Sequence, residues 1–341
     1  MKYHVYAIGN ALVDLEYTVD ETFLQAHGID KGLTTLINAD AQENTIAALR
    51  AQPVKRSCGG SAANTVIALQ QFGGQGYFTC KVADDEAGRF FASDLHHTGV
   101  HSNLQLDQLD TTAATGKCLV MVTDDADRTL HTYLGISEYI STKELNTSAI
   151  EAADFVYLEG YLVTSPTGRD AAIQTHALAH AKNTRVAMTF SDPNMVNFFR
   201  DGLSEMAGDH LDLLFCNEQE ALQWATCTTL QQAVEALKTR ADTFVITLGA
   251  RGALIYDGQR CTTLPGNPVR ATDTVGAGDM FAGAFLYAIT HGHDYLSAGN
   301  LAIAASAELV KTFGARLSLD AQQAILKTWL TTQVQAQAST L

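Results

Sequence analysis

Basic residues are scarce in this sequence of 341 residues, which has 22 lysines and arginines against 37 aspartates and glutamates. A formal net charge of −15 repels the phosphate backbone of nucleic acids, and no segregated basic patch offsets it. We therefore expect no nucleic-acid partner. A small anion is still compatible with this charge, because the free amides at a helix N-terminus bind phosphate without any lysine.

Paired cysteines and long apolar runs are also lacking. The six cysteines form no C-x-x-C motif, and a chain of this length needs no disulfides to stabilise its core. The first segment reaches Asp14 before a signal-peptide core can form, and no apolar run approaches a membrane span. We expect reduced thiols in a cytoplasmic protein that does not interact with membranes.

Two common nucleotide-binding motifs are missing. The Gly116-Lys117 pair is followed by cysteine and is not part of G-x-x-x-x-G-K-[ST]. The glycines after Gly276 and Gly278 next recur at Gly283, so there is no G-x-G-x-x-G, and the first strand is not followed by a dehydrogenase glycine fingerprint. The sequence thus favours neither a P-loop protein nor a dehydrogenase.

Short apolar runs alternate with longer helical patterns along most of the chain. This arrangement is typical of an α/β fold, in which helices cover both faces of a parallel sheet. The expected strands are 4–10, 155–160, 185–190, 213–217 and 243–249. The expected helices are 61–72, 85–97, 166–182, 218–225, 230–239 and 294–312.

Two strand-rich regions interrupt that alternation. The segment 31–37, and the segments 115–123 and 128–135, have little helix between them and predict a small separate sheet. Placed beside the carboxyl ends of the parallel strands, such a sheet would make a lid. We assign 1–12, 39–104 and 136–341 to a large α/β domain, and 13–38 and 105–135 to the lid.

A glycine-rich turn precedes an apolar helix at Asp273-Thr-Val-Gly-Ala-Gly-Asp279. The first amides of that helix have no intrahelical acceptor, and the small side chains let an anion approach them. The turn therefore predicts an anion hole. Asp279 has two interpretations: an acid that stabilises the first helical turn, or a general base beside a bound phosphoryl group.

Four motifs in order resemble the PfkB/ribokinase family of small-molecule kinases. The stretch "DTVGAGDMFAGAF" resembles the second family signature and "CGGSAANTVIALQQFGG", residues 58–74, the first. "NEQE" at 217–220 resembles the N-x-x-E motif, and "TLGARGALI" follows it. Within the family, "GNALVD" and the segment 115–135 are most similar to adenosine kinases and their bacterial relatives. The similarity covers nearly the whole chain.

The resemblance implies a ribokinase-like fold, with a large parallel-sheet α/β domain and a small β lid. It also implies transfer of the ATP γ-phosphate to a primary hydroxymethyl group. Asp279 would be the catalytic base and also contact the acceptor, while the amides of Gly276, Ala277 and Gly278 would stabilise charge on the transferring phosphoryl group.

For the acceptor, the resemblance implies sugar binding by five residues that also have ordinary structural uses. Asp14 would accept two ribose hydroxyls, with Asn10 beside it and Asn64 supplying a further amide. Gly59 and Gly60 would let the sugar approach the backbone. The alternatives are a turn asparagine, a capping aspartate and a tight Gly-Gly turn.

On the ATP side, Asn217 and Glu220 would order Mg²⁺ and its waters, or else form a helix cap with a capping box. Thr247, Gly249 and Gly252, with Gly276 and Gly278, would contact ATP, although the "TLGARG" segment also suits a plain β-hairpin turn.

Several further positions have two interpretations. Arg128 either reaches the phosphates when the lid closes or is a solvated loop arginine. Leu36, Tyr133 and Leu134 either line an acceptor base or form the core of the small sheet. Asp192 is interpreted as a turn former.

Some relatives use a monovalent cation such as K⁺, and Asp273 and Gly314 match that location, but carbonyl ligands leave no side-chain signature.

The function predicted from these motifs is an ATP- and Mg²⁺-dependent kinase of purine salvage that converts adenosine to AMP. A PfkB-type sugar kinase acting on ribose or fructose is the alternative, and a non-catalytic nucleotide sensor is a third. The expected partner is the small-molecule acceptor, and the expected state is a monomer or homodimer.

Overall fold

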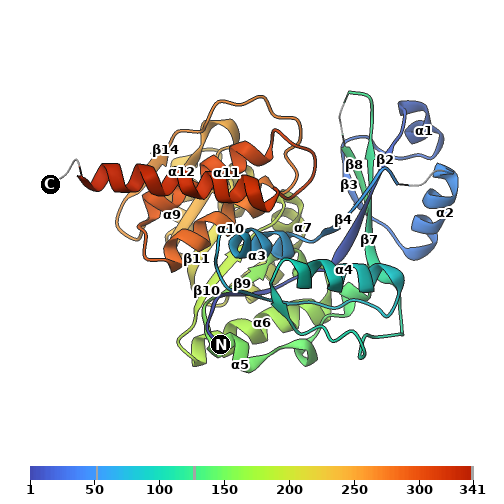
Figure 1. Cartoon of the computed structure of the whole chain (residues 1–341), viewed down its shortest axis with the longest axis horizontal. Helices are drawn as coiled ribbons and strands as arrows, with labels where there is room; N and C mark the ends of the chain where they lie inside the picture. The colour runs from blue at the N-terminus through green and yellow to red at the C-terminus, as the bar shows by residue number, and fades with distance from the viewer. Residues whose placement is uncertain (51–52, 126–127, 339–341) are drawn as a thin grey trace.

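The protein has two β-sheets of unequal size with helices around them (Figure 1). The computed structural model describes residues 1–50, 53–125 and 128–338. The predicted domain ranges also include 51–52, 126–127 and 339–341, which lie outside this description. Within the described residues the six cysteines are unpaired, and four of them are buried.

The larger sheet has the strand order β14-β13-β12-β11-β10-β9-β1-β5-β6 in the described part of the chain. From β12 to β6 neighbouring strands are parallel, whereas β12, β13 and β14 pair antiparallel. The strands are β1 (Tyr3–Ile8), β5 (Gly76–Thr79), β6 (His101–Ser102), β9 (Ala153–Glu159), β10 (Arg185–Thr189), β11 (Leu211–Asn217), β12 (Ala241–Thr247), β13 (Ala253–Tyr256) and β14 (Cys261–Leu264). The five strands expected from the apolar runs are β1, β9, β10, β11 and β12.

Both faces of the larger sheet are buried, which explains why its strands read as continuous apolar runs. In β1, Val5 and Ala7 pack into one cluster while Tyr6 and Ile8 pack into another. The first cluster involves α3 (Ser61–Gln71), α4 (Glu86–His97), α10 (Ala277–Thr290), α11 (Tyr295–Leu309) and α12 (Leu319–Ala338). The second involves α5 (Thr147–Glu151), α6 (Pro166–Ala181), α7 (Pro193–Ala207), α8 (Glu218–Ala225) and α9 (Leu230–Leu237).

The smaller sheet has the order β3-β8-β7-β2-β4 in the described residues. Its strands are β2 (Leu12–Thr18), β3 (Thr34–Leu36), β4 (Lys55–Gly59), β7 (Thr115–Val122) and β8 (Arg128–Gly135). In Figure 1, α1 (Glu21–Ala26) and α2 (Ala39–Leu49) lie on the side of this sheet that faces away from the larger part. The expectation of a large, mainly parallel α/β sheet with a second small sheet is thus confirmed.

The two sheets divide the chain differently from the predicted ranges. Both α2 and β4 fall in the range 39–104 assigned to the large domain, but α2 packs against the smaller sheet and β4 pairs with β2 in it. The segment "KRSCG" of β4 lacks the apolar alternation that marks a strand. Its strand structure depends on pairing with β2, which local sequence does not reveal.

The helix α10 packs closely against α3 because its contact surface is made of small residues. A Cβ atom added at Gly283 would lie 2.5 Å from the Thr65 carbonyl oxygen and 2.7 Å from the Ala68 Cβ. At Gly278, in the first turn of the same helix, an added Cβ would meet nothing within 4 Å. The two glycines therefore have different roles: Gly283 permits packing, and Gly278 leaves the helix end open.

We expect Gly283→Ala to lower the free energy of unfolding by about 1–3 kcal/mol, because overpacking outweighs the gain in helix propensity. Gly278→Ala is the matched control and should leave stability unchanged or slightly higher. Urea unfolding followed by circular dichroism measures both. Equal midpoints for the two variants would contradict the proposed contact between α3 and α10.

Candidate active site

Polar residues gather where neighbouring strands of the larger sheet end. Glu159, Asn217 and Thr247 are the last residues of β9, β11 and β12, and Asn10 follows β1 by two positions. These strands are parallel, so their carboxyl ends lie at the same edge of the sheet. In open α/β sheets the crevice outside these ends is the usual ligand site.

Asp279, in the first turn of α10, has its hydrogen-bond partners on α3. Its Oδ1 accepts a hydrogen bond from Ser61 Oγ at 2.7 Å, and its Oδ2 accepts one from Asn64 Nδ2 at 3.1 Å. Burial raises the pKa of Asp279 to about 6, although these two hydrogen bonds and the Arg316 guanidinium act in the opposite direction. Partners on another helix do not fit a carboxylate that simply caps α10.

The amino end of α10 presents free amide groups. Gly276 adopts a left-handed conformation with φ of 77°, and its carbonyl accepts from the Met280 amide. The Ala277 amide donates to the Thr274 carbonyl at 3.2 Å, whereas the Gly276 and Gly278 amides have no acceptor among the described residues. Two free amides at the positive end of a helix dipole are the kind of donors that an anion site uses.

Asp14 lies on β2 of the smaller sheet, next to the glycine pair of β4. A Cβ at Gly59 would lie 2.4 Å from Asp14 Oδ1, and one at Gly60 would lie 2.2 Å from the Asn10 carbonyl oxygen. The two glycines are therefore required by Asp14 and Asn10 themselves. Burial raises the pKa of Asp14 to about 7, and the positive charges of Arg316 and Arg128 act in the opposite direction.

Glu159 is a buried acid that the sequence analysis missed. Its carboxylate accepts hydrogen bonds from the Asn10 backbone at 3.2 Å, from Asn10 Nδ2 at 3.0 Å and from the Ala62 amide at 2.8 Å. Burial raises its pKa to about 7. Glu159 thereby joins β1 to the start of α3 and orients Asn10, and its position as the polar last residue of an apolar strand was a usable signal.

Ser61 and Arg316 were also missed as site residues. Ser61 follows the Gly-Gly pair directly, and its hydroxyl contacts Asp279. Arg316, in the segment between α11 and α12, donates from Nε to Asn64 Oδ1 at 2.9 Å. No local signal marks Arg316, because it is 252 residues away from its partner.

Asn217 and Glu220 form a capping box at the start of α8. Asn217 Oδ1 accepts from the Glu220 amide at 2.8 Å, and the Glu220 carboxylate accepts from the Asn217 backbone at 3.0 Å and its side-chain amide at 2.7 Å. Burial raises the pKa of Glu220 to about 7. The capping box expected as the alternative is therefore present, and it holds the Asn217 and Glu220 side chains together at the end of β11.

Gly249 and Gly252 lie in the turn between β12 and β13, and Thr247 is the last residue of β12. The two strands pair antiparallel, and the Leu248 amide donates to the Gly252 carbonyl at 2.8 Å, so the segment is a hairpin. A Cβ at Gly252 would lie 2.0 Å from the Leu264 carbonyl oxygen, whereas one at Gly249 would meet nothing within 4 Å. Gly252 is thus required by the hairpin, and Gly249 borders open space.

One face of the smaller sheet carries both polar and apolar residues beside the site. The strand registers place Ser57, Asp14, Cys118, Thr132 and Leu36 in one row across β4, β2, β7, β8 and β3. Paired residues of neighbouring strands point to the same face of a sheet. Leu36 is 53% exposed, so it does not belong to a core of the small sheet.

Arg128 begins β8 and joins the smaller sheet to the turn before α10. Its Nη2 lies 3.0 Å from Asp273 Oδ2 and 3.5 Å from Glu16 Oε2. The side chain is 10% exposed. Of the two interpretations of Arg128, the solvated loop arginine is therefore wrong.

Side chains and backbone groups at the expected K⁺ location already make contacts within the protein. The Asp273 carboxylate accepts from the Val275 and Gly314 amides and pairs with Arg128. Nearby, the Val310 carbonyl accepts from two amides, and Lys55 Nζ donates to the Phe313 carbonyl at 3.1 Å. Two protein cations, Arg128 and Lys55, therefore already lie at this location, whereas the backbone carbonyls of Asp273 and Gly314, the expected ligand type, are not among these contacts.

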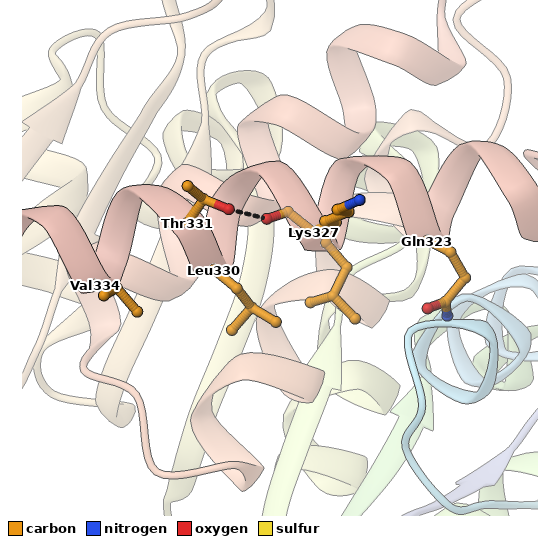
Figure 2. A pocket seen from close by; sticks show the side chains of 6 residues that line it. Gln323, Lys327, Leu330, Thr331 and Val334 are labelled. Atoms are coloured by element: carbon orange, nitrogen blue, oxygen red, sulfur yellow. Dashed lines mark hydrogen bonds between the residues drawn. The ribbon is translucent and has the colours of Figure 1, made fainter.

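Some features elsewhere in the described chain lie apart from this group of residues. Asp192 caps α7 by accepting from the Asn194 amide, as a turn former should. A shallow hollow is lined by α12 residues alone, among them Leu330 and Val334, and is separate from the residues above (Figure 2). The described residues contain no group of three or more His, Cys, Asp or Glu placed to hold a metal, and no helix there has the length and hydrophobicity to cross a membrane.

Comparison with known proteins decides the class of this site. Residues 32–322 match the model of the pfkB family of carbohydrate kinases. The chain belongs to this family. Its fold is therefore ribokinase-like, and it is a phosphotransferase that uses an alcohol group as acceptor, acting on a small nucleoside or sugar.

Several relatives of this pfkB-family kinase are adenosine kinases. The crystal structure of the adenosine kinase from Sinorhizobium meliloti is 32% identical with a TM-score of 0.86, covering 95% of this chain and 100% of that one. A probable sugar kinase from Rhizobium etli CFN 42 is 29% identical with a TM-score of 0.85, covering 96% and 100%. The adenosine kinase of Saccharomyces cerevisiae is 26% identical over 309 residues, 84% of this chain and 88% of the relative.

Because Arg128 and Lys55 already place positive charge at this location, we expect the kinase to be independent of K⁺. Initial rates in potassium chloride and in choline chloride at equal ionic strength should be the same. The release of ADP, measured with a saturating acceptor, tests this. A rate that increases and then saturates as K⁺ replaces choline would show that the cation displaces the internal contacts.

Proposed function

We propose that this kinase transfers the γ-phosphate of ATP to the 5′ hydroxymethyl group of a nucleoside, and that adenosine is its best acceptor, giving AMP and ADP. Such a reaction belongs to purine salvage. The observation that carries the choice of a nucleoside is the exposed Leu36 in the same row of the smaller sheet as Asp14. Similarity to several adenosine kinases supports the same choice.

Asp14 and Leu36 suit the two ends of a nucleoside. The Asp14 carboxylate can accept hydrogen bonds from two neighbouring ribose hydroxyls, with Asn10, Asn64 and the backbone at Gly60 nearby. An exposed leucine suits a flat base better than a free sugar hydroxyl, because burying an unpaired hydroxyl costs about 1–3 kcal/mol. The row therefore offers a polar end and an apolar end on one face.

Asp279 would act as the general base. Its carboxylate would take the proton from the attacking hydroxyl, and a pKa of about 6 keeps it ionised at neutral pH. The free amides of Gly276 and Gly278 would donate to the oxygens of the transferring phosphoryl group. The Ala277 amide would contribute only after leaving the Thr274 carbonyl.

The ATP side would be formed by Thr247, Gly249 and Gly252 of the hairpin and by Asn217. Bound Mg²⁺ neutralises charge on the phosphates of ATP and keeps much of its own water shell. Asn217 would hold one of those waters, and Glu220 would orient Asn217 through the capping box. The open space beside Gly249 and Gly278 suits a phosphate chain close to the backbone.

The smaller sheet would close over the acceptor as a lid and exclude water, so that ATP is not hydrolysed without acceptor. Arg128 links this sheet to the anion site through Asp273. Closure would therefore bring Asp14 and the phosphoryl-binding turn together in one movement.

A sugar kinase with the same chemistry is the second candidate, favoured by similarity to a probable sugar kinase. The diol contacts alone serve a free sugar as well as a nucleoside. A non-catalytic sensor is less favoured, because a sensor has no need of a part-buried carboxylate like that of Asp279. ADP release that depends on added acceptor separates a kinase from a sensor.

We expect Asp279→Asn to lower kcat about 10²–10⁴-fold, the range typical of a general base, because the change removes proton acceptance at nearly constant volume. The fold and ATP binding should be retained. Steady-state kinetics and calorimetric ATP titration measure the two properties. The parental kcat should also fall as pH decreases through about 6, where Asp279 becomes protonated. Parental turnover by the variant would leave Asp279 a structural role only.

We expect adenosine to have a higher kcat/KM than ribose, fructose or other free sugars, because only a nucleoside places a base against Leu36. A panel of nucleosides and sugars with ATP and Mg²⁺, followed by ADP release and product mass, measures this. Leu36→Ser should reduce the preference for adenosine, with Leu33→Ser, also exposed, as the matched control. Faster turnover of a free sugar than of every nucleoside would replace adenosine by a sugar.

A further inference from the structure

The side-chain amide of Asn64 lies between the Asp279 carboxylate and the Arg316 guanidinium group. Its Nδ2 donates to Asp279 Oδ2 at 3.1 Å, and its Oδ1 accepts from Arg316 Nε at 2.9 Å. The two ends of an asparagine amide are nearly equal in size and differ in hydrogen bonding. The neighbours of Asn64 therefore decide which end faces the carboxylate.

Arg316 permits only one of the two orientations. A guanidinium group has five donors and no acceptor, so it can bind only the oxygen end of the amide. If the Asn64 amide turned over, its oxygen would face the Asp279 carboxylate and its N–H₂ would face the guanidinium, so both contacts would become repulsive. The contact with Arg316 thus selects the orientation that donates to Asp279.

Arg316 is itself held in place from α4. Its Nη1 donates to Asp94 Oδ2 at 2.7 Å, and its side chain is 18% exposed. Its Nη2 is buried and has no acceptor within the part of the chain that the structure describes. A cation is therefore fixed beside the carboxylates of the site, although nothing in the reaction requires Arg316 to touch the substrate.

We propose that Arg316 is a positioning residue for phosphoryl transfer: it holds the Asn64 amide with its N–H directed at Asp279 and places a positive charge beside that carboxylate. This inference rests on the proposed role of Asp279 as the base. It goes beyond that role, because it states how an aspartate among buried acids is kept ready to accept a proton.

The charges around Asp279 support this role. Asp14 on β2 and Glu159 on β9 are acids that interact with Asp279, and Arg316 is the cation that lowers its pKa. Arg316 also lowers the pKa of Asp14, as does Arg128. Without the Arg316 charge, burial would raise the pKa of Asp279 further, and more of the base would be protonated near neutral pH.

The first experiment measures the pKa of Asp279 without relying on activity. Aspartate carboxyl carbons labelled with ¹³C are titrated by NMR, and the Asp279 signal is assigned by its loss in Asp279→Asn. Arg316→Gln should raise the pKa of Asp279 by about 0.5–1, since a nearby charge is lost. Arg316→Lys, which keeps the charge, should leave the pKa near its parental value.

Arg89→Gln is the control for the loss of one positive charge, because Arg89 also pairs with an aspartate but is 57% exposed. It should leave the pKa of Asp279 unchanged. An unchanged pKa in Arg316→Gln would overturn the electrostatic part of the proposal. This titration decides the point even if no acceptor is phosphorylated, which would instead overturn the proposed function.

The second experiment is a double-mutant cycle on kcat at saturating adenosine. Arg316→Lys should lower kcat about 10- to 100-fold, the scale expected for a misplaced catalytic group, because lysine lacks the planar guanidinium that selects the amide orientation. In an Asn64→Ala background the same change should lower kcat little further. Independent, multiplicative losses would show that Arg316 does not act through Asn64, and unchanged thermal unfolding of Arg316→Lys excludes a general loss of structure.

Discussion

The packing of α3 against α10 is the interaction on which the candidate active site depends. Small residues, Gly283 above all, let the two helices approach until Ser61 and Asn64 reach Asp279. A carboxylate at the amino end of an apolar helix is then partly removed from water but keeps two hydrogen-bond donors. This combination gives a pKa of about 6, below neutral pH and well above that of an exposed aspartate.

The remaining parts are arranged around this pair of helices by the parallel sheet. Glu159 connects the end of β9 to Asn10 and to the start of α3. Asn10, which is proposed to bind the acceptor, is thereby joined to α3, the helix whose side chains contact Asp279. Gly59 and Gly60 bring the smaller sheet close to the same point, because any side chain there would collide with Asp14 or Asn10. The site is thus one connected unit made from both sheets.

Charge is distributed unevenly in this acidic protein. The chain has only 22 basic residues, yet Arg128 and Arg316 both lie among the acids of the site. Arg128 neutralises Asp273 from the smaller sheet, and Arg316 acts beside Asp279 through Asn64. A γ-phosphoryl group would otherwise enter a region dominated by carboxylates, where its negative charge would be disfavoured.

Local sequence patterns predicted five strands of the larger sheet and the motif residues, because an apolar run or a glycine turn involves only neighbouring residues. They did not reveal β4, whose sequence is polar, or the partners Ser61, Glu159 and Arg316. The interpretation of Asn217 and Glu220 as a capping box was also available from their spacing, since a box spans a single turn. Whether Asn217 and Glu220 contribute to a metal site depends on groups that are distant from them in the sequence.

By itself, the sequence determined the α/β class, the order of the motifs and the glycine-rich amino end of α10. These features follow from residues within a few positions of one another, where helix, strand and turn preferences act. Only the tertiary structure decided that Arg128 pairs with Asp273, that Lys55 contacts the Phe313 carbonyl near the expected K⁺ location, and that Arg316 donates to Asn64. Those contacts join residues far apart in the chain, and their energies depend on distance and burial, which sequence spacing does not contain.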